Sequence, residues 1–389
     1  MTNFYIVDPL VTSFGYIYYL DACRKAHGLD LSINLVLTGK RTDYPFLDGA
    51  HLCSSIVFLQ EGQPLVHASD VVIAGSDTAI PYVSSLRSRN KLRQNKGLYL
   101  AALPARHRLD MFHYTPETEP SEALTWAREN LPVFIKPVNG TGSEDVHCVR
   151  TLVEFQEMLK YLITQKGYKE LVLQKKHEGK EIQIDLTSSM TGAFGVTAIW
   201  TAYRGYRNYS WLENYDELSP TFKASLSSLI GALRGLDTVY GLYHVETIFD
   251  GTDLKVIEIN FRRHGHITFQ AYRDGCGYSQ IEADVISYLW PRTWEKRFSD
   301  KVLPRLKYTA RMWIRNRITK YIEFDVNEVS ALPSVAKVIP HSNLFNRVVE
   351  PSSEFAGTYL AAVILQNYSS DQLHEDLANA YAWAESRFG

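Results

Sequence analysis

The sequence predicts an α/β protein in which a parallel sheet comes first and a mixed sheet follows. Two observations carry this prediction. In residues 1–85, short apolar segments alternate with a helical pattern, and strand–helix alternation is typical of a parallel sheet. Residues 241–265 contain two alternating segments joined at Asp250-Gly251, a dipeptide that tolerates positive φ and therefore favours a hairpin.

The expected elements follow one another along the whole chain. Strands are expected over 4–7, 31–37, 54–59, 70–75, 131–137, 171–174, 182–186, 193–200, 306–314, 322–326, 335–339 and 357–366. Helices are expected over 13–27, 86–103, 120–130, 151–166, 219–236, 280–289 and 370–388. Gly28 suits the end of the first helix, and Pro120 suits the first turn of the third. No chemistry motif stands in 300–389, which leaves a lid, an extra sheet or a dimer surface open.

Composition narrows the functional class. The chain of 389 residues is long enough for two or three domains, and its net charge of −2 gives no basic field for nucleic acid or an anionic membrane. It has no apolar run of about 18 residues and no basic N-terminal leader, so we expect neither a membrane span nor secretion. The four cysteines are far apart in sequence. We expect free thiols that pack as small apolar residues in a cytoplasmic protein.

One face of the second hairpin strand carries unusual polarity. A period of two puts Glu258, Asn260 and Arg262 on the same face. Glu246 on the neighbouring strand would complete three oxygen ligands, which suits a hard cation such as Mg²⁺. From these residues alone, an edge strand with a solvated polar face remains the alternative.

A second feature is a loop rich in glycine. Gly140-Thr141-Gly142-Ser143 follows an apolar strand that ends in Lys136-Pro137. Such a loop can fold over phosphates, because glycine lets backbone N–H groups approach closely. The Walker sequence is absent, so this is a different kind of phosphate loop. The charge of Lys136 would reach the same phosphates.

Taken in order, the motifs resemble the ATP-grasp superfamily over roughly residues 70 to 275. They are most similar to its carboxylate–amine ligases, which include D-alanine–D-alanine ligase and the bacterial L-amino-acid ligases. Asn90-Lys91-Leu92-Arg93 with Leu103-Pro104 resembles the first ATP lysine and the G-x-P that follows, with Ala102 in place of glycine. Phe134 to Pro137, followed by the glycine loop, resembles the second ATP lysine and the mobile loop.

Two further motifs complete the resemblance. Residues 174–181 resemble the hinge motif E-x-x-x-x-G-x-E, although Gln174 replaces the glutamate and Lys175-Lys176-His177 replaces acidic and aliphatic residues. Residues 258–262 resemble the metal and phosphate strand E-x-N-x-R, with Glu246 as the upstream carboxylate.

The resemblance implies an ATP-grasp fold with an N-terminal open parallel sheet domain, a central lid subdomain and a C-terminal mixed sheet domain. The expected bounds are 1–85 for the N-terminal domain, 86–190 for the small lid subdomain with its linking helix, 191–295 for the large subdomain with the metal site, and 296–389 for a C-terminal extension.

The resemblance also implies ATP and Mg²⁺ as cofactors, with a second ion open and Mn²⁺ as a substitute. The implied nucleotide residues are Lys91, Lys136, Gly140, Thr141, Gly142, Ser143, Gln174, Lys175, His177 and Glu181. Glu246, Glu258 and Asn260 would hold the metal. Arg262 would stabilise the transferred phosphoryl group, and it forms the catalytic set with Glu258 and Asn260.

The substrate residues are expected in two places. Residues 200–215 contain six aromatic side chains with Arg204 and Arg207 between them, which suits a segment that covers a substrate and binds its carboxylate. A tyrosine-rich packing loop is the alternative. Arg263 and His266 are further candidates, although either could serve only in packing.

The implied reaction joins a carboxylate to an amine. ATP phosphorylates the acid, and the amine attacks the acyl phosphate to give an amide, ADP and phosphate. The expected partners are a small-molecule acid and amine, with amino acids and a dipeptide product preferred, and a homodimer is left open. One alternative has ammonia, a polyamine or a peptide terminus as the acceptor. The other is a non-catalytic, regulatory nucleotide-binding module.

Overall fold

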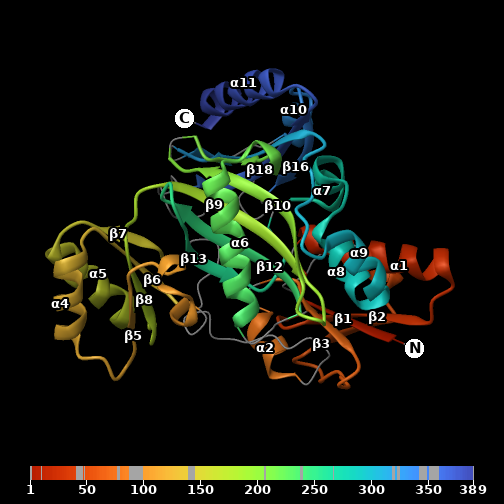
Figure 1. The fold of residues 1–389 in the computed structure, drawn as a ribbon, viewed down its shortest axis with the longest axis horizontal. Helices are drawn as coiled ribbons and strands as arrows, with labels where there is room; N and C mark the ends of the chain where they lie inside the picture. The colour runs from red at the N-terminus through yellow and green to blue at the C-terminus, as the bar shows by residue number, and fades with distance from the viewer. Residues whose placement is uncertain are drawn as a thin grey trace.

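The computed structural model describes residues 2–9, 11–40, 47, 49–76, 79–86, 100–138, 145–205, 207–236, 240–265, 267–317, 320–321, 325–340, 348–349 and 359–388. The expected helix over 86–103 and the expected strand over 322–326 fall largely outside these ranges. The mixed α/β architecture confirms the predicted class (Figure 1). None of the described helices is long and apolar enough to cross a membrane.

The N-terminal unit is an open parallel sheet, as predicted. Its strands are β1 (Thr2–Val7), β2 (Leu31–Leu37), β3 (Ser55–Phe58) and β4 (Val71–Ala74), in the order β3-β2-β1-β4. Helix α1 (Gly15–His27) ends at Gly28, whose φ of 60° is the left-handed conformation that glycine adopts without strain. The short helix α2 (Ile80–Ser85) follows β4.

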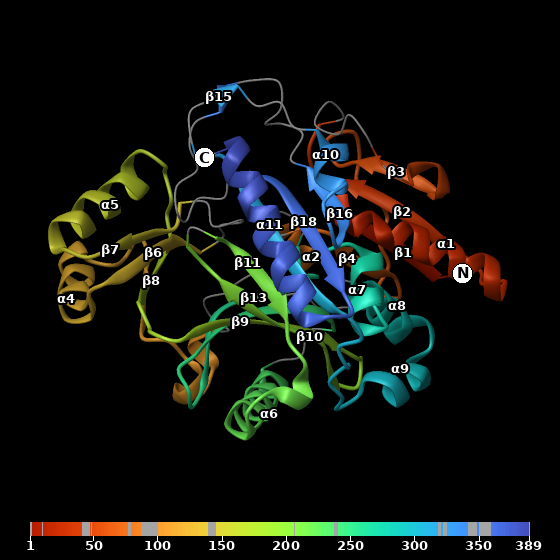
Figure 2. The same cartoon turned by 90° about the horizontal axis from the view of Figure 1, so that it is seen from above.

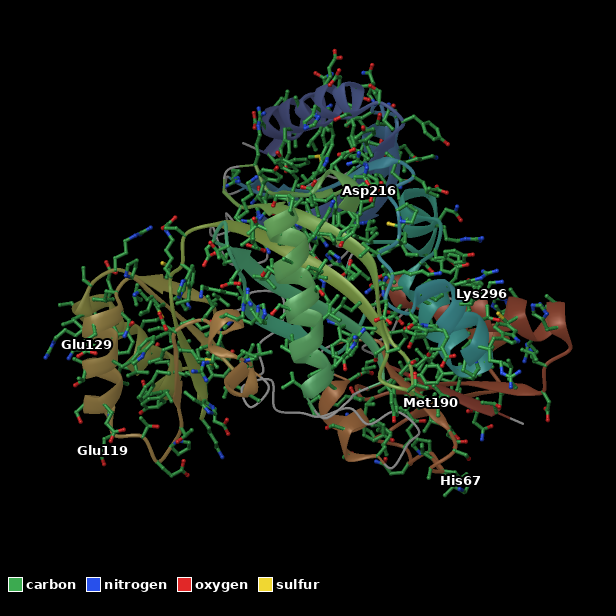
Figure 3. All side chains as sticks on the ribbon, in the orientation of Figure 1. His67, Glu119, Glu129, Met190, Asp216 and Lys296 are labelled. Atoms are coloured by element: carbon green, nitrogen blue, oxygen red, sulfur yellow. The ribbon has the colours of Figure 1, made fainter. Side chains whose placement is uncertain are left out.

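A second unit is a small antiparallel sheet covered by two helices. Its strands are β5 (Met111–Tyr114), β6 (Val133–Pro137), β7 (His147–Val149) and β8 (Leu171–Lys175), in the order β5-β8-β6-β7. Helices α4 (Pro120–Asn130) and α5 (Leu152–Thr164) pack on it, and a capping box between Thr151 and Glu154 starts α5. Glu119 and Glu129 mark the two ends of α4 at the far side of this unit (Figure 3).

The centre of the protein is an eight-stranded antiparallel sheet among the described residues. Its order is β13-β12-β9-β10-β11-β14-β18-β16. The strands are β9 (Lys180–Ser188), β10 (Phe194–Tyr203), β11 (Tyr209–Leu212), β12 (Gly241–Phe249), β13 (Leu254–Asn260), β14 (Tyr308–Arg315), β16 (Val335–Pro340) and β18 (Tyr359–Asn367). The hinge motif therefore leads directly from the small sheet into β9 of the large one. The expected aromatic segment forms the end of β10, a turn and β11.

The C-terminal segment continues the large sheet and also contains a separate two-stranded sheet of β15 (Lys320–Tyr321) and β17 (Val348–Val349). Strand β14 pairs with β11, so the chain from Tyr308 onward shares hydrogen bonds with the central strands. Helix α11 (Ser370–Phe388) lies across β14 and β18 and buries Leu373, Leu377 and Tyr381 against them (Figure 2). The remaining elements are helices α7 (Phe269–Cys276), α8 (Gln280–Leu289), α9 (Pro291–Phe298) and α10 (Val326–Ser330).

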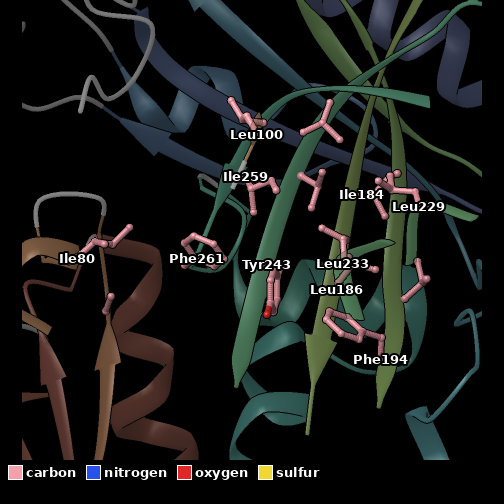
Figure 4. Packing of buried hydrophobic residues seen from close by; sticks show 14 of the residues in the cluster. Ile80, Leu100, Ile184, Leu186, Phe194, Leu229, Leu233, Tyr243, Ile259 and Phe261 are labelled. Atoms are coloured by element: carbon pink, nitrogen blue, oxygen red, sulfur yellow. The ribbon is translucent and has the colours of Figure 1, made fainter. Parts of the chain in front are cut away.

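Helix α6 (Pro220–Gly235) covers one face of the central strands and explains which side chains remain on the other. Its residues Leu229 and Leu233 contact the cluster that contains Ile184, Tyr243 and Ile259 (Figure 4). Because side chains alternate along a strand, the residues between these apolar ones point to the opposite face. The four cysteines are free, as expected, and Cys23 and Cys276 are buried.

Candidate active site

The face of the large sheet opposite α6 carries a row of polar side chains on three adjacent strands. The register pairs Glu246 on β12 with Glu258 on β13, and His244 with Asn260. On its other edge β12 pairs with β9, which brings Glu246 beside Gln183 and His244 beside Asp185; Asp185 is fully buried. The structure thus brings together the three residues that the sequence predicts as metal ligands.

A β-bulge shapes the edge of this site. Strand pairing runs from Glu246–Glu258 to Thr247–Val256, so Ile257 is an extra residue on β13. Its carbonyl oxygen accepts a hydrogen bond from Lys136 Nζ at 3.2 Å and another from Gln174 Nε2 at 3.1 Å. The small sheet therefore touches the large one beside Glu258. The predicted phosphate lysine and the predicted metal strand meet at this contact.

The predicted hinge residues lie along the same contact. Gln174 is almost fully buried, and Lys175 ends β8. His177 Nε2 is buried without a hydrogen-bond partner among the described residues and lies 3.7 Å from Asp110 Oδ2. Burial lowers the pKa of His177, which favours the neutral imidazole at physiological pH. These positions suit a wall of the nucleotide site.

Glu181, the predicted ribose ligand, is engaged by an arginine. Arg204 Nε lies 3.0 Å from Glu181 Oε1 and 2.9 Å from Oε2, and its Nη2 also contacts Oε1. This guanidinium therefore faces the predicted nucleotide residues. By contrast, Arg207 lies 3.5 Å from Glu385 of α11 and stacks over Tyr381, away from the predicted metal ligands.

The two consecutive arginines after β13 differ in their surroundings. Arg262 is half-buried, and its Nη1 donates to the backbone carbonyl of Arg263 at 2.8 Å. Arg263 is 3% exposed, and it donates from Nε to Ser13 Oγ at 2.9 Å and from Nη1 to the Ile267 carbonyl at 2.8 Å. Burial lowers the pKa of Arg263 to about 10. Arg263 thus connects this end of the hairpin to the N-terminal unit.

Next to the predicted metal ligands lies a buried network that no sequence motif predicts. Its centre is Asp185, whose oxygens contact His244 Nδ1 at 2.8 Å, His264 Nδ1 at 3.0 Å and Trp200 Nε1 at 2.8 Å. The hydroxyl of Tyr272 donates to the same carboxylate. Burial opposes ionisation, but the two histidines outweigh it and hold the pKa of Asp185 below its usual range.

The network extends in two directions from Asp185. Through His244 it reaches Glu246, because His244 Nε2 lies 3.3 Å from Glu246 Oε1. Through His264 it reaches Arg311 of β14, whose Nη1 lies 2.6 Å from His264 Nε2. Alternation of polar residues on β9, at Gln183 and Asp185, was the available sequence signal for this network. The alternation of the first hairpin strand also puts His244 on the same face as Glu246, whereas His264 and Arg311 carried no signal.

Asp185, His244 and His264 also lie close enough together to be considered as a metal site. Their nearest ligand atoms are within 4.8 Å of one another, and all three residues are buried. Each of those atoms is already used, however, because both Nδ1 atoms face Asp185 and His264 Nε2 faces the cation of Arg311. The donor set therefore fits a satisfied hydrogen-bond network better than a metal.

Glu246, Glu258 and Asn260 fit a hard divalent ion better. They offer two carboxylates and an amide from adjacent strands, which is the oxygen chemistry that Mg²⁺ prefers. Burial opposes the charge of Glu246, but its contact with His244 outweighs burial and keeps the pKa of Glu246 below its usual range. The carboxyl group of Glu246 is thus held in its charged form. Lys91, Gly140, Thr141, Gly142, Ser143 and His266 lie outside the described residues.

A small cavity lies at the end of the hairpin beside Arg262. It has a volume of about 20 Å³ and is lined by Tyr16, Gly241, Arg263 and Asp284, among others. Asp284 accepts from the Tyr16 hydroxyl at 2.7 Å through Oδ2, while its Oδ1 has no hydrogen-bond partner in the part of the chain that the structure describes. Burial raises the pKa of Asp284 to about 7. The space is sufficient for about one water-sized group.

Comparison with known proteins gives the fold of the chain. No family model and no curated protein matches the sequence. Solved structures match it closely. An L-amino acid ligase from Bacillus licheniformis superposes with a TM-score of 0.73 at 14% identity, over 98% of this chain and 97% of that one.

Two other solved structures extend the likeness. A carboxyaminoimidazole ribonucleotide synthase from Aspergillus clavatus, complexed with ATP, gives a TM-score of 0.67 at 13% identity over 99% of both chains. The biotin carboxylase domain of a Hydrogenobacter thermophilus 2-oxoglutarate carboxylase, solved with MgADP and bicarbonate, gives 0.65 at 12% identity over 97% of this chain and 89% of that one. The chain therefore has the ATP-grasp fold over nearly its whole length.

Proposed function

We propose that the protein is an ATP-dependent carboxylate–amine ligase that releases ADP and phosphate. The observation that carries this proposal is the meeting of the Lys136 ammonium with β13 at Ile257, next to paired Glu246 and Glu258. A nucleoside triphosphate that binds between two sheets needs a cation for its phosphates and a site for a hard metal ion. Here the two lie side by side on separate sheets. A solvated edge strand would not need the contact with Lys136.

Each residue of the site would then have its own role in binding ATP and the metal ion. Lys136 would hold phosphate oxygens, and Gln174, Lys175 and His177 would form the wall for the adenine ring. Glu181 would accept from the ribose. Glu246, Glu258 and Asn260 would hold Mg²⁺, which supplies charge neutralisation for the triphosphate when it is bound.

Arg262 would act where negative charge develops. The acid's oxygen attacks the γ-phosphorus, ADP leaves, and the amine nitrogen then attacks the acyl carbon and expels phosphate, losing its proton to water. Both steps place extra negative charge on oxygens, and an arginine fork is suited to bind them. The transfer itself needs mainly alignment and charge stabilisation.

We further propose amino acids as the acid and the amine, which the likeness to an L-amino acid ligase supports. Arg204 and Arg207 remain candidates for binding a substrate carboxylate, and the placement of Arg204 beside Glu181 favours it over Arg207. The four units, with three boundaries at residues 85, 190 and 295, stay part of the proposal. Strand β9 precedes the boundary at residue 190, although it pairs with β10 and β12 of the large sheet.

The test is an assay of nucleotide products with purified protein, ATP, Mg²⁺ and a panel of amino-acid pairs. We expect ADP and phosphate to form only when an acid and an amine are both present, with an amide detected by mass spectrometry. Glu258→Gln is the matched variant, because it keeps size and hydrogen bonding but removes one ligand charge. AMP and pyrophosphate would refute the mechanism. Tight ATP binding without turnover on any pair would favour a regulatory module.

A further inference from the structure

We propose that His244, clamped by Asp185, is a positioning residue that orients Glu246 for the divalent ion. The inference rests on the proposed function, because it assumes that Glu246 is a metal ligand. It assigns a role to two residues that stand outside all four ATP-grasp motifs. Their arrangement alone suggests the role.

The geometry places His244 between two carboxylates. Its Nδ1 lies 2.8 Å from Asp185 Oδ1, and its Nε2 lies 3.3 Å from Glu246 Oε1. A carboxylate at each nitrogen can be satisfied only if both nitrogens carry a proton. The ring is therefore an imidazolium that donates a hydrogen bond to Asp185 on one side and forms an ion pair with Glu246 on the other.

The ring is fixed on every side. Asp185 is fully buried and is itself held by Trp200 Nε1 and the Tyr272 hydroxyl, so it cannot follow a turning ring. The other face of His244 stacks on His264, with ring centroids 4.0 Å apart and an angle of 31° between planes. His264 is held in turn, because its backbone N–H donates to Gln280 Oε1 at 2.8 Å. His244 thus presents its Nε2 proton in one direction.

Glu246 needs such a partner more than an ordinary strand residue does. It lies directly opposite Glu258, and like charges at paired strand positions repel. Its side chain is 26% exposed, so that it could otherwise swing toward water. The contact with His244 uses Oε1. Within the described part of the chain, the second carboxylate oxygen has no hydrogen-bond partner and remains available to an ion.

We expect the support that His244 gives to Glu246 to outweigh the repulsion between the imidazolium and the metal ion. The charge of the imidazolium is offset by Asp185 at 2.8 Å, so the ion meets a neutral pair with one directed proton instead of a net positive charge. Hydrogen bonds to a ligating carboxylate typically change metal affinity by about 10–100-fold when they are removed. We expect the same range here.

The experiment measures Mn²⁺ binding to the protein–ADP complex by electron paramagnetic resonance, with no turnover involved. Two variants of His244 separate its contact with Asp185 from its contact with Glu246. The amide nitrogen of His244→Asn falls near Nδ1 and can reach only Asp185, whereas that of His244→Gln falls near Nε2 and can reach Glu246. We expect His244→Asn to weaken Mn²⁺ binding by about 10–100-fold and His244→Gln to retain most of the affinity.

His107→Gln is the matched control. His107 is also a fully buried histidine with two hydrogen bonds, to the Leu254 carbonyl and Ser228 Oγ, each at 2.8 Å. It contacts the start of β13, whereas the proposed metal ligands Glu258 and Asn260 lie at the other end of that strand. Its loss should lower the melting temperature without changing the Mn²⁺ affinity of the folded protein.

Each result decides the question. Equal Mn²⁺ affinity in His244→Asn, His244→Gln and the parent protein would overturn the positioning role, and tighter binding in His244→Asn would show that the imidazolium competes with the ion. If Glu258→Gln weakens Mn²⁺ binding in the same series, the metal site stands and this inference alone has failed. If the parent ADP complex binds no Mn²⁺, the proposed function fails together with the inference.

Discussion

The ammonium of Lys136 lies 3.2 Å from the carbonyl oxygen of Ile257, which connects the small sheet to the bulged edge of the large one. The two residues are 121 positions apart in sequence. A lysine that hydrogen-bonds a carbonyl is easily redirected to a phosphate, because phosphate oxygens carry charge and the carbonyl does not. We therefore expect a bound nucleotide to draw the Lys136 ammonium away from this carbonyl.

Replacing Lys136 by methionine should weaken ATP binding without unfolding the protein. Methionine keeps the length and packing of the side chain but removes the donor, and a hydrogen bond to a charged group contributes about 1.5–3 kcal/mol. We expect the Kd for ATP to rise by at least about tenfold in calorimetry. The exposed Lys180 provides the control, since Lys180→Met should leave the Kd unchanged. An unaltered Kd in Lys136→Met would remove Lys136 from the nucleotide site.

Restoring the glutamate usual in ATP-grasp proteins at position 174 should impair this one. Gln174 Nε2 donates to the Ile257 carbonyl at 3.1 Å, and a carboxylate there would face that carbonyl with no proton to offer. Gln174→Glu should lower both the melting temperature and ATP affinity. The same change at exposed Gln165 should do neither. Tighter ATP binding in Gln174→Glu would contradict the role that we assign to the amide.

The two consecutive arginines should separate activity from stability. Arg262→Ala should reduce kcat by about 10²–10³-fold, because the charge that stabilises the transition state is lost, while the melting temperature stays near that of the parent. Arg263→Ala should destabilise the fold by about 1–3 kcal/mol for each partner left unpaired, since Ser13 and the Ile267 carbonyl lose their donor. Denaturant titrations and steady-state kinetics on both variants measure this. The reverse pattern would exchange the two roles.

Asp284 should make stability depend on pH. Its pKa is raised from the ordinary 3.8 to about 7 in the folded chain, so the folded state holds a proton that the unfolded state has lost. Asp284 therefore makes its full contribution to the free energy of unfolding below pH 4, and this contribution is lost as the pH rises to about 7. The difference corresponds to at most about 4 kcal/mol.

Asp284→Asn should remove this dependence, because the amide keeps an acceptor for Tyr16 and never ionises. We expect the variant and the parent to have similar unfolding free energies near pH 4. The variant should gain steadily up to pH 7 and keep a constant advantage above it. Urea titrations at several pH values measure the difference. An advantage that is the same at every pH would show that the carboxyl group is not the cause.

The sequence predicted which polar side chains share one face of the hairpin, because that information is local. Alternation along β13 placed Glu258 and Asn260 on one face, and the hairpin brought Glu246 opposite Glu258. The bulge at Ile257 could not be seen, because it depends on which residues pair across the strands. The strict alternation expected for 256–261 accordingly fails at that residue, and Val256 and Ile259 both join the apolar core.

Interactions across distant strands escaped prediction for the same reason. Asp185 contacts His244 and His264 from positions 59 and 79 residues away, and neither histidine belongs to a motif. Arg311 stands in a segment that showed no chemistry in sequence, yet it reaches His264 because β14 is a strand of the central sheet. Only the order of strands in space reveals such neighbours.

The union of β14 with β11 has a consequence for how this protein can be shortened. A chain that stopped before Tyr308 would leave β11 with bare amide and carbonyl groups along one side and would uncover Trp211, which packs against β14, β18 and α11 in the full chain. Exposed edges of that kind recruit other chains. Fragments designed to isolate the nucleotide-binding part should thus end beyond α11, and shorter ones should be recovered mainly as aggregates.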